Sequence, residues 1–211
     1  MSKKRRKKKV VMLAFIILII IGVVLYVILF KFGNVGSSSS KAFAEIKEYG
    51  YKIEKRDTDL IKNTFYNLKD VLSKDEIDYE KYSEYISTLF IADFYTLDNK
   101  NNKYDIGGAD YIYSEKQDNF KLKAVETIYK YVEDKDNRKQ KLPEVVSVEV
   151  SNIKEDTFEY NEKKYDAYSL DVNWEYKKDL GYDTKGSIIL IKDDNKLSIA
   201  SFTPEVSKWK E

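Results

Sequence analysis

The chain has 211 residues, which is enough for one folded domain and a membrane anchor but not for two full domains beside that anchor. It contains neither Cys nor His, so disulfides, thiol nucleophiles, thiolate metal sites and the commonest general base are excluded. The net charge is +1, but when Lys31 and the seven basic residues at positions 3–9 are set aside, 29 basic residues remain against 36 acidic ones. That larger part of the chain is acidic and should not bind nucleic acid.

An uncharged segment of 21 residues follows the basic N-terminus. It runs from Val10 to Phe30, and a helix of this length spans a hydrocarbon core of about 30 Å. The basic residues before it are Lys3, Lys4, Arg5, Arg6, Lys7, Lys8 and Lys9. By the positive-inside rule they keep residues 1–9 in the cytoplasm. The sequence therefore predicts a single-pass protein of the cell membrane, embedded in the lipid bilayer, with its C-terminal part outside the cytoplasm.

A cleaved signal peptide is the alternative interpretation of this segment. The sequence Ala42-Phe43-Ala44 offers small residues at the spacing of a cleavage site. However, the apolar run is longer than the 7 to 15 residues of a signal peptide, and Ala44 lies fourteen residues beyond Phe30. These two distances favour a retained anchor.

The segment after the span divides into a tether and a helical region. Residues 31–41 are rich in Gly and Ser and predict a flexible tether. From Phe43 onward apolar residues recur at helical spacing, which predicts a juxtamembrane helical segment over residues 42–76. Gly50 weakens a helix locally, and Asp57-Thr58-Asp59 is a good start for a new one. One long helix and two shorter helices are both compatible with this pattern.

Residues 77–204 are expected to form the outer domain. Asp78 is a suitable N-cap, and the apolar stripe that follows predicts a helix over about residues 79–94. Gly107-Gly108 indicates a turn, and a further helix is expected over about residues 115–133.

After Pro143 the apolar period changes from 3.6 to 2, which indicates strands. Strands are expected over residues 146–150 and 158–160, over 168–176 after a turn at 161–164, and in a last hairpin that pairs 185–192 with 196–202. Residues 205–211 are a C-terminal tail. Helices followed by an antiparallel meander predict the α+β class, with an N-terminal transmembrane helix and then helices packed on the concave face of a curved antiparallel sheet.

No motif indicates catalysis or a cofactor. Asp171, Asn173 and Glu175 share one strand face and are the nearest approach to an acid/base pair or a cation site. Residues two apart on an exposed strand face are more typical of a solvated surface. Asp193-Asp194-Asn195 has calcium-loop chemistry, but it lacks the length and closing Glu of such a loop and fits a hairpin turn. We therefore expect no metal, no cofactor and no enzymatic activity.

Aromatic residues supply two further candidate sites. One face of the predicted strand 168–176 is a stripe that either lines a ligand pocket or packs in the core, and its members are Tyr168, Leu170, Val172, Trp174 and Tyr176. The chain has 18 Tyr residues, and Tyr is enriched at protein interfaces. Four of them fall outside the apolar stripes and are candidate interface residues: Tyr49, Tyr51, Tyr111 and Tyr113.

The order of basic tail, single span, tether, helices and twisted antiparallel sheet resembles the bitopic assembly factors of bacterial type IV secretion and conjugation machines. The resemblance implies an outer domain with the nuclear-transport-factor-2-like, or cystatin-like, fold. The segment from Leu89 to Leu97, the sequence Asp105-Ile106-Gly107-Gly108 and the stretch from Phe120 to Val132 also resemble an uncharacterised family of clostridial membrane proteins. Neither resemblance assigns a catalytic residue.

These observations predict a membrane-anchored interaction module that assembles with other envelope proteins. The alternative is a small-ligand-binding or sensor domain with a cone-shaped pocket near Trp174. The sequence leaves the oligomeric state open.

Overall fold

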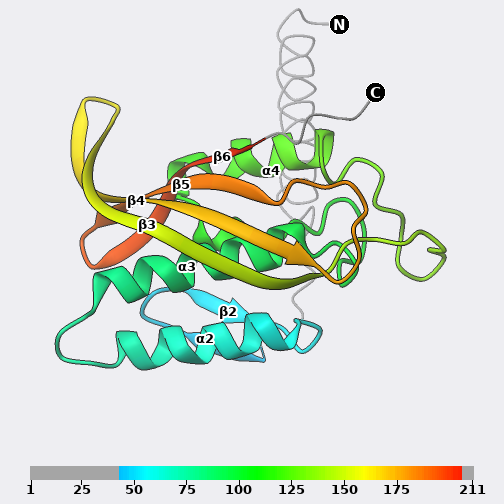
Figure 1. The fold of residues 1–211 in the computed structure, drawn as a ribbon, viewed down its shortest axis with the longest axis horizontal. Coiled ribbons are helices and arrows are strands. Elements are labelled where there is room, and N and C mark those ends of the chain that lie inside the picture. The colour runs from blue at the N-terminus through cyan, green and yellow to red at the C-terminus, as the bar shows by residue number, and fades with distance from the viewer. Residues whose placement is uncertain (1–42, 206–211) are drawn as a thin grey trace, which may run out of the picture. The chain divides into compact units, whose positions relative to one another are not determined.

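A computed structural model describes residues 43–205 (Figure 1). The predicted cytoplasmic tail, membrane span and tether lie outside these residues, and so does the chain after residue 205. Within the described range, no helix combines the length and the apolar composition that a membrane crossing requires.

The described chain begins with a short β-hairpin, where the apolar spacing predicted a helix. β1 (Ala44–Ile46) pairs antiparallel with β2 (Tyr51–Ile53), and Gly50 takes a φ of +70° in the turn between them. In β2 the two outer residues are buried and Lys52 between them is exposed, which is a period of two. The prediction of a helical segment over all of residues 42–76 is therefore wrong in its first part.

Two helices follow the hairpin. α2 (Asp59–Leu72) begins at Thr58, whose side chain accepts a hydrogen bond from the Ile61 N–H, so the predicted new start at this point is confirmed. α3 (Tyr79–Tyr95) begins after Asp78, whose carboxylate accepts from the Lys81 N–H at 3.0 Å. α3 lies between α2 and the sheet and is buried on both sides (Figure 1).

An irregular segment leads from α3 to the sheet. It contains two 3₁₀ turns, η1 (Ala109–Tyr111) and η2 (Ser114–Lys116), and then α4 (Gln117–Glu126). The helix predicted to continue to residue 133 ends here, because Thr127 leaves the helical conformation and Tyr129 turns inward to bond to the Phe94 carbonyl. α4 packs on α3 through Phe120, whose ring lies 5.0 Å from that of Phe94 between centroids.

The rest of the described chain is a curved, four-stranded antiparallel sheet. Its strands occur in chain order as β3 (Val145–Tyr160), β4 (Lys163–Tyr176), β5 (Lys185–Asp193) and β6 (Lys196–Pro204). Tight turns join β3 to β4 and β5 to β6, where non-glycine residues take the positive φ that two-residue hairpin loops require. The α+β class, with helices on a curved antiparallel sheet, is confirmed for the described residues.

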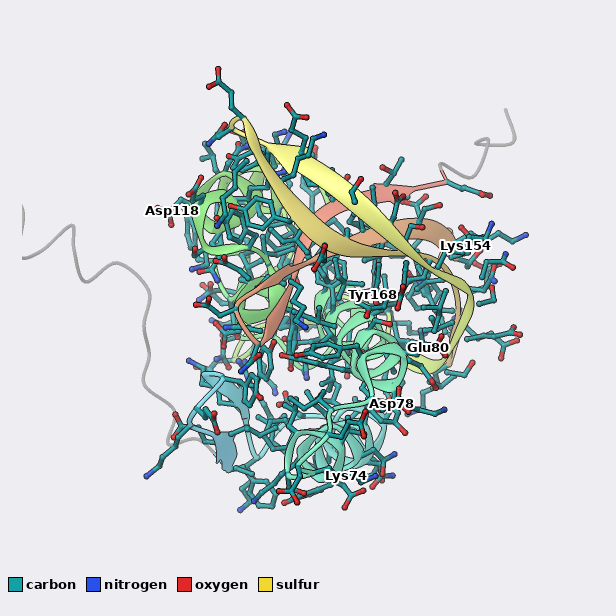
Figure 2. The ribbon with its side chains drawn as sticks, turned by 90° about the vertical axis from the view of Figure 1, so that its left-hand side faces the viewer. Lys74, Asp78, Glu80, Asp118, Lys154 and Tyr168 are labelled. Carbon is teal, nitrogen blue, oxygen red and sulfur yellow. The ribbon has the colours of Figure 1, made fainter. Side chains whose placement is uncertain are left out.

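The core lies between α3 and the concave face of the sheet. Tyr168 lies beside the first turn of α3, near Glu80 (Figure 2), and its ring stacks on that of Tyr79 at 6.4 Å. Lys154 lies on the opposite, outward side of the sheet (Figure 2).

Candidate functional site

The stripe predicted to line a pocket is mainly core. Leu170, Val172 and Trp174 are buried, and Tyr168 and Tyr176 are half-buried. Trp174 is 2% exposed, and its ring packs 4.7 Å from that of Tyr95 between centroids. Its indole N–H donates to the Tyr176 hydroxyl at 2.8 Å, and that hydroxyl donates to the Asp183 carbonyl at 2.7 Å. The Trp174 ring is therefore part of the core at this end of the sheet.

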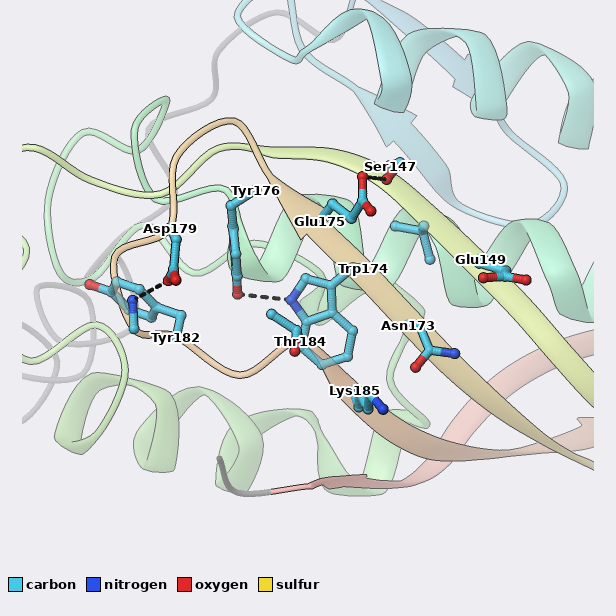
Figure 3. Close-up of a pocket in the computed structure, with 12 residues that line it drawn as sticks. Ser147, Glu149, Asn173, Trp174, Glu175, Tyr176, Asp179, Tyr182, Thr184 and Lys185 are labelled. Carbon is cyan, nitrogen blue, oxygen red and sulfur yellow. Dashed lines mark hydrogen bonds between the residues drawn. The ribbon is translucent and has the colours of Figure 1, made fainter. Parts of the chain in front are cut away.

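A groove with a volume of about 760 Å³ does border this stripe, but it is open to solvent (Figure 3). β3, β4 and the loop between β4 and β5 form its walls, and Trp174 and Tyr176 are part of its lining. Its charged residues are Glu149, Glu175, Asp179 and Lys185. The groove is thus an open surface feature with a net negative set of charges, rather than the enclosed cone-shaped pocket that the sequence suggested.

The three polar residues that share one face of β4 are solvated or bonded to their neighbours. Asp171 accepts hydrogen bonds from the side chains of Asn152, at 2.8 Å, and Ser187, at 3.1 Å. Glu175 accepts from the Ser147 hydroxyl at 3.2 Å. Over residues 43–205, no group of three or more acidic side chains is arranged to hold a metal ion.

The four tyrosines predicted as an interface are all buried, which corrects that prediction. Tyr49, Tyr51, Tyr111 and Tyr113 have exposed fractions of 8%, 0%, 3% and 7%. The first two belong to the unexpected N-terminal hairpin, and the last two belong to the segment of 3₁₀ turns. They stood outside the apolar stripes because they do not lie on the long helices. Their aromatic rings therefore belong to the packed interior of the described domain.

A partly buried ionic cluster joins the β2–α2 loop to the end of α3, and sequence reasoning did not find it. Lys100 is 1% exposed and donates to Asp93 at 2.5 Å, and Asp93 also accepts from the Gly108 N–H at 2.6 Å. Arg56 forms a two-pronged ion pair with Asp105. These contacts connect segments that are far apart in the chain.

Two carboxyl groups of this cluster have shifted pKa values. Burial, and then the nearby charge of Asp93, raises the pKa of Asp57 to about 6. Burial alone would raise the pKa of Asp105, but hydrogen bonds from Arg56 and Asn101 lower it. A carboxyl group that titrates near neutrality is a common feature of catalytic sites. The cluster does not line the groove described above, and its visible role is to hold the two loops together.

Glycine is required beside this cluster. A Cβ atom at Gly107 would lie 2.2 Å from the Asp93 carbonyl oxygen, which no real structure allows. The Gly107 N–H also donates to the buried Tyr129 hydroxyl at 3.1 Å. The turn predicted at Gly107-Gly108 is confirmed, and its purpose is close packing against α3.

The sheet has two outer strands, and one of them is closed by the chain itself. Ile112 forms a parallel bridge with Ile199 of β6, and the Tyr113 N–H donates to the Ile199 carbonyl at 2.9 Å. The Lys116 ammonium group donates to the Ala200 carbonyl at 2.7 Å. The segment of 3₁₀ turns therefore covers this edge of the sheet at Ile199 and Ala200.

The other outer strand, β3, is open. Trp174 donates its backbone N–H to the Thr184 carbonyl, on the β5 side of β4. Backbone N–H and C=O groups point to alternate sides along a strand. The backbone groups of Asn173 therefore point to β3, and those of its partner Glu149 point to β4. The two valines beside Glu149 therefore direct their N–H and C=O groups away from the sheet.

These outward groups belong to Val148 and Val150. Between residues 43 and 205, no hydrogen bond reaches their outward side, since β3 pairs with β4 alone. Nearby, the side chain of Val146 is 45% exposed. A strand edge with free backbone groups and apolar side chains is able to pair with another strand.

No protein-family model, no curated protein and no solved structure matches this chain. The described residues define an α+β domain whose sheet has one closed edge and one open edge. The proposal below therefore depends on the geometry of the sheet and on the sequence of residues 1–42, which precede the described domain.

Proposed function

We propose that this chain is a membrane-anchored, extracytoplasmic protein-interaction domain without enzymatic activity. The observation that carries the proposal is the open edge of β3, at Val148 and Val150, on a sheet whose other edge is bridged by the chain itself at Ile199. The order of basic tail, span, tether, helices and sheet expected from the sequence resembles that of secretion and conjugation assembly factors, whose outer domains have the nuclear-transport-factor-2-like fold. We propose the same role here, as a subunit that binds other proteins of the envelope.

Strand addition is the mode of binding that this edge favours. An added strand satisfies the free N–H and C=O groups of β3, and these backbone bonds supply affinity without a deep pocket. The exposed Val146 offers apolar area beside them. The groove begins at residues 147–149 of the same strand, so a bound segment would have access to it as well.

The membrane part of the proposal follows from residues 1–30. The seven basic residues before the apolar run orient it, and the domain that follows then lies outside the cytoplasm. Protease added to intact protoplasts is expected to degrade residues 43–205, while a tag at the N-terminus stays protected. Protection of the domain in intact protoplasts, with degradation after lysis, would reverse the topology.

The interaction role is tested by crosslinking in intact cells. A photoreactive benzophenone amino acid replaces Val146 in the full-length chain, and a matched control carries it at Leu122, which is 59% exposed on α4. We expect discrete protein adducts from position 146 and none from position 122. Equal adducts from both positions, or none from either, would reject the open edge as a binding surface.

Binding of a small ligand is a second candidate function, and the groove of about 760 Å³ is the observation that favours it. Its carboxylates would suit a cationic compound. A thermal-shift screen with small cations tests it, and a true site would lose its response when Tyr182, on the groove wall, is replaced by Ala. A response that survives Tyr182→Ala would place the binding elsewhere.

A further inference from the structure

The two halves of the open edge differ in how well they are protected from pairing. In β3 a register shift between Ser151 and Lys154 separates them, and Asn152 takes a φ of +55° there. A second register shift, between Val145 and Ser147, marks the start of the first half. Beyond the shift at Asn152, Glu155 pairs with Tyr168, so its carboxylate lies on the side of the sheet that faces the helices. Inward-facing charges of this kind prevent strand addition. Before the shift at Asn152, the corresponding positions are Val148 and Val150.

Residues 146–150 have the sequence Val-Ser-Val-Glu-Val, which is nearly the same in both directions. If two such segments pair antiparallel around Val148, each Glu149 lies opposite a Ser147 rather than another carboxylate. Val146, at the register shift between Val145 and Ser147, then lies opposite Val150, and the two Val148 side chains meet on the helix side, where their β4 partner Trp174 is. The segment is therefore complementary to itself in shape, and this register keeps the two Glu149 carboxylates from lying directly opposite each other.

We propose that residues 146–150 pair with the same residues of a second copy of this chain, with a two-fold axis at Val148. The two four-stranded sheets then join into one sheet of eight strands. This inference rests on the proposed function, because it names the first partner of the interaction domain.

Neighbouring registers are less suitable than the one centred on Val148. Centring on Glu149 would set two carboxylates directly against each other. Centring on Val150 would place Val148 opposite Asn152, whose positive φ disrupts a regular ladder. Centring on Ser147 would place Val150 opposite Glu144, whose carbonyl already accepts from the Lys177 N–H at 2.9 Å.

Membrane anchoring makes a small interface sufficient. A few cross-strand pairs bury less area than stable soluble dimers do. Two copies held in one bilayer meet at a high effective concentration, which offsets that deficit. The pairing is therefore expected in the membrane and is expected to weaken when the chain is diluted in detergent.

The test uses the absence of Cys in the natural chain. One copy carries Ser147→Cys and a differently tagged copy carries Glu149→Cys, both full length, in the same membrane. These positions are exposed and lie directly opposite each other in the proposed register, where Cα atoms of such a pair are about 4.5 Å apart, within reach of a disulfide. Two copies of Ser147→Cys alone would be offset by two residues, at about 7–8 Å, which is too far.

Mild oxidation should therefore link the mixed pair about ten-fold more than either variant alone, as the distance limit for disulfides requires. Val148→Cys provides a second measurement, since it lies on the axis and should link to itself. If neither the mixed pair nor Val148→Cys forms a disulfide, the inference fails. If adducts from the photoreactive residue at position 146 persist in that case, the interaction function stands and the strand binds a different protein.

Discussion

Tyr51 in β2 and Tyr82 in α3 share a hydrogen bond of 2.8 Å between their hydroxyl groups, and both also bond to the backbone of Leu197 at the start of β6. The Tyr51 hydroxyl donates to the Leu197 carbonyl at 2.8 Å, so it accepts from Tyr82. The Leu197 N–H donates in turn to Tyr82 at 3.2 Å. This closed set of three bonds fastens the N-terminal hairpin to the sheet, and burial raises the pKa of both phenols.

Tyr51→Phe removes the group that donates to Leu197 and leaves a buried carbonyl without a partner. We expect a loss of about 1–3 kcal/mol in the free energy of unfolding. Denaturant unfolding of a fragment spanning Ser40–Glu211 measures it. Tyr66→Phe is the control, because Tyr66 is 47% exposed and should cost almost nothing. Equal stabilities of the two variants would mean that the hydroxyl bonds do not stabilise the domain.

Trp174→Ala removes a large buried ring that packs against Tyr95 and Phe202. The cavity left behind should cost about 3–5 kcal/mol of stability. Tyr131→Ala provides the comparison, since Tyr131 is 72% exposed and its loss should stay within about 0.5 kcal/mol. A nearly neutral effect of Trp174→Ala would show that the ring is a pocket wall and not core.

The raised pKa of Asp57 predicts how stability depends on pH. The folded protein holds this proton up to a pKa of about 6, whereas the unfolded chain releases it near the ordinary aspartate pKa of 3.8. Between these values the folded state binds more protons than the unfolded state, so this group makes stability fall as pH rises. The stabilising contribution of Asp57 is complete below 3.8 and is lost once pH passes about 6.

Asp57→Asn isolates this contribution. Asp105, whose pKa is lowered, gives stability the opposite pH dependence, but it is present in both proteins and its effect cancels in their difference. The stability of the natural protein minus that of Asp57→Asn should decrease between pH 4 and pH 6 by about 1–3 kcal/mol. Thermal unfolding at a series of pH values gives that difference. A difference that is constant with pH would show that the Asp57 carboxyl group keeps its ordinary pKa in the folded protein.

Regular elements of the domain were predictable because their patterns are local. Asp78 as a cap and the apolar stripe after it defined α3, and the change of period after Pro143 defined the strands. The N-terminal hairpin was not predictable, because three-residue strands are too short to show a period and the apolar residues around Gly50 also fit a helix.

The sites depend on relations that a single sequence does not show. Lys100 and Asp93 form a buried ion pair, yet each alone resembles a surface residue. The open edge of β3 follows from the strand order and from the direction of the backbone N–H of Trp174. Both are properties of the folded sheet and are not visible in the local sequence. Val-Ser-Val-Glu-Val was visible as a strand, but nothing local indicated that its outward side is free.

Proline scanning of β3 tests the direction of its backbone groups, on which the proposed pairing depends. The Val148 N–H points to the open edge and bonds to nothing within the described range, so Val148→Pro should cost only about 1 kcal/mol of stability, as for proline at a strand edge. The Glu149 N–H faces β4, so Glu149→Pro should cost about 3 kcal/mol or more. Denaturant unfolding compares the two variants, which differ by one position.

The same variants separate folding from association. Val148→Pro should leave the domain folded but remove the central hydrogen bonds of the two-fold pair, so it should abolish the disulfide between Ser147→Cys and Glu149→Cys copies. If Val148→Pro destabilises the domain as much as Glu149→Pro does, the Val148 N–H faces β4, and the open edge is assigned to the wrong residues. If the disulfide forms undiminished in a folded Val148→Pro protein, the two copies meet without the backbone pairing that we propose.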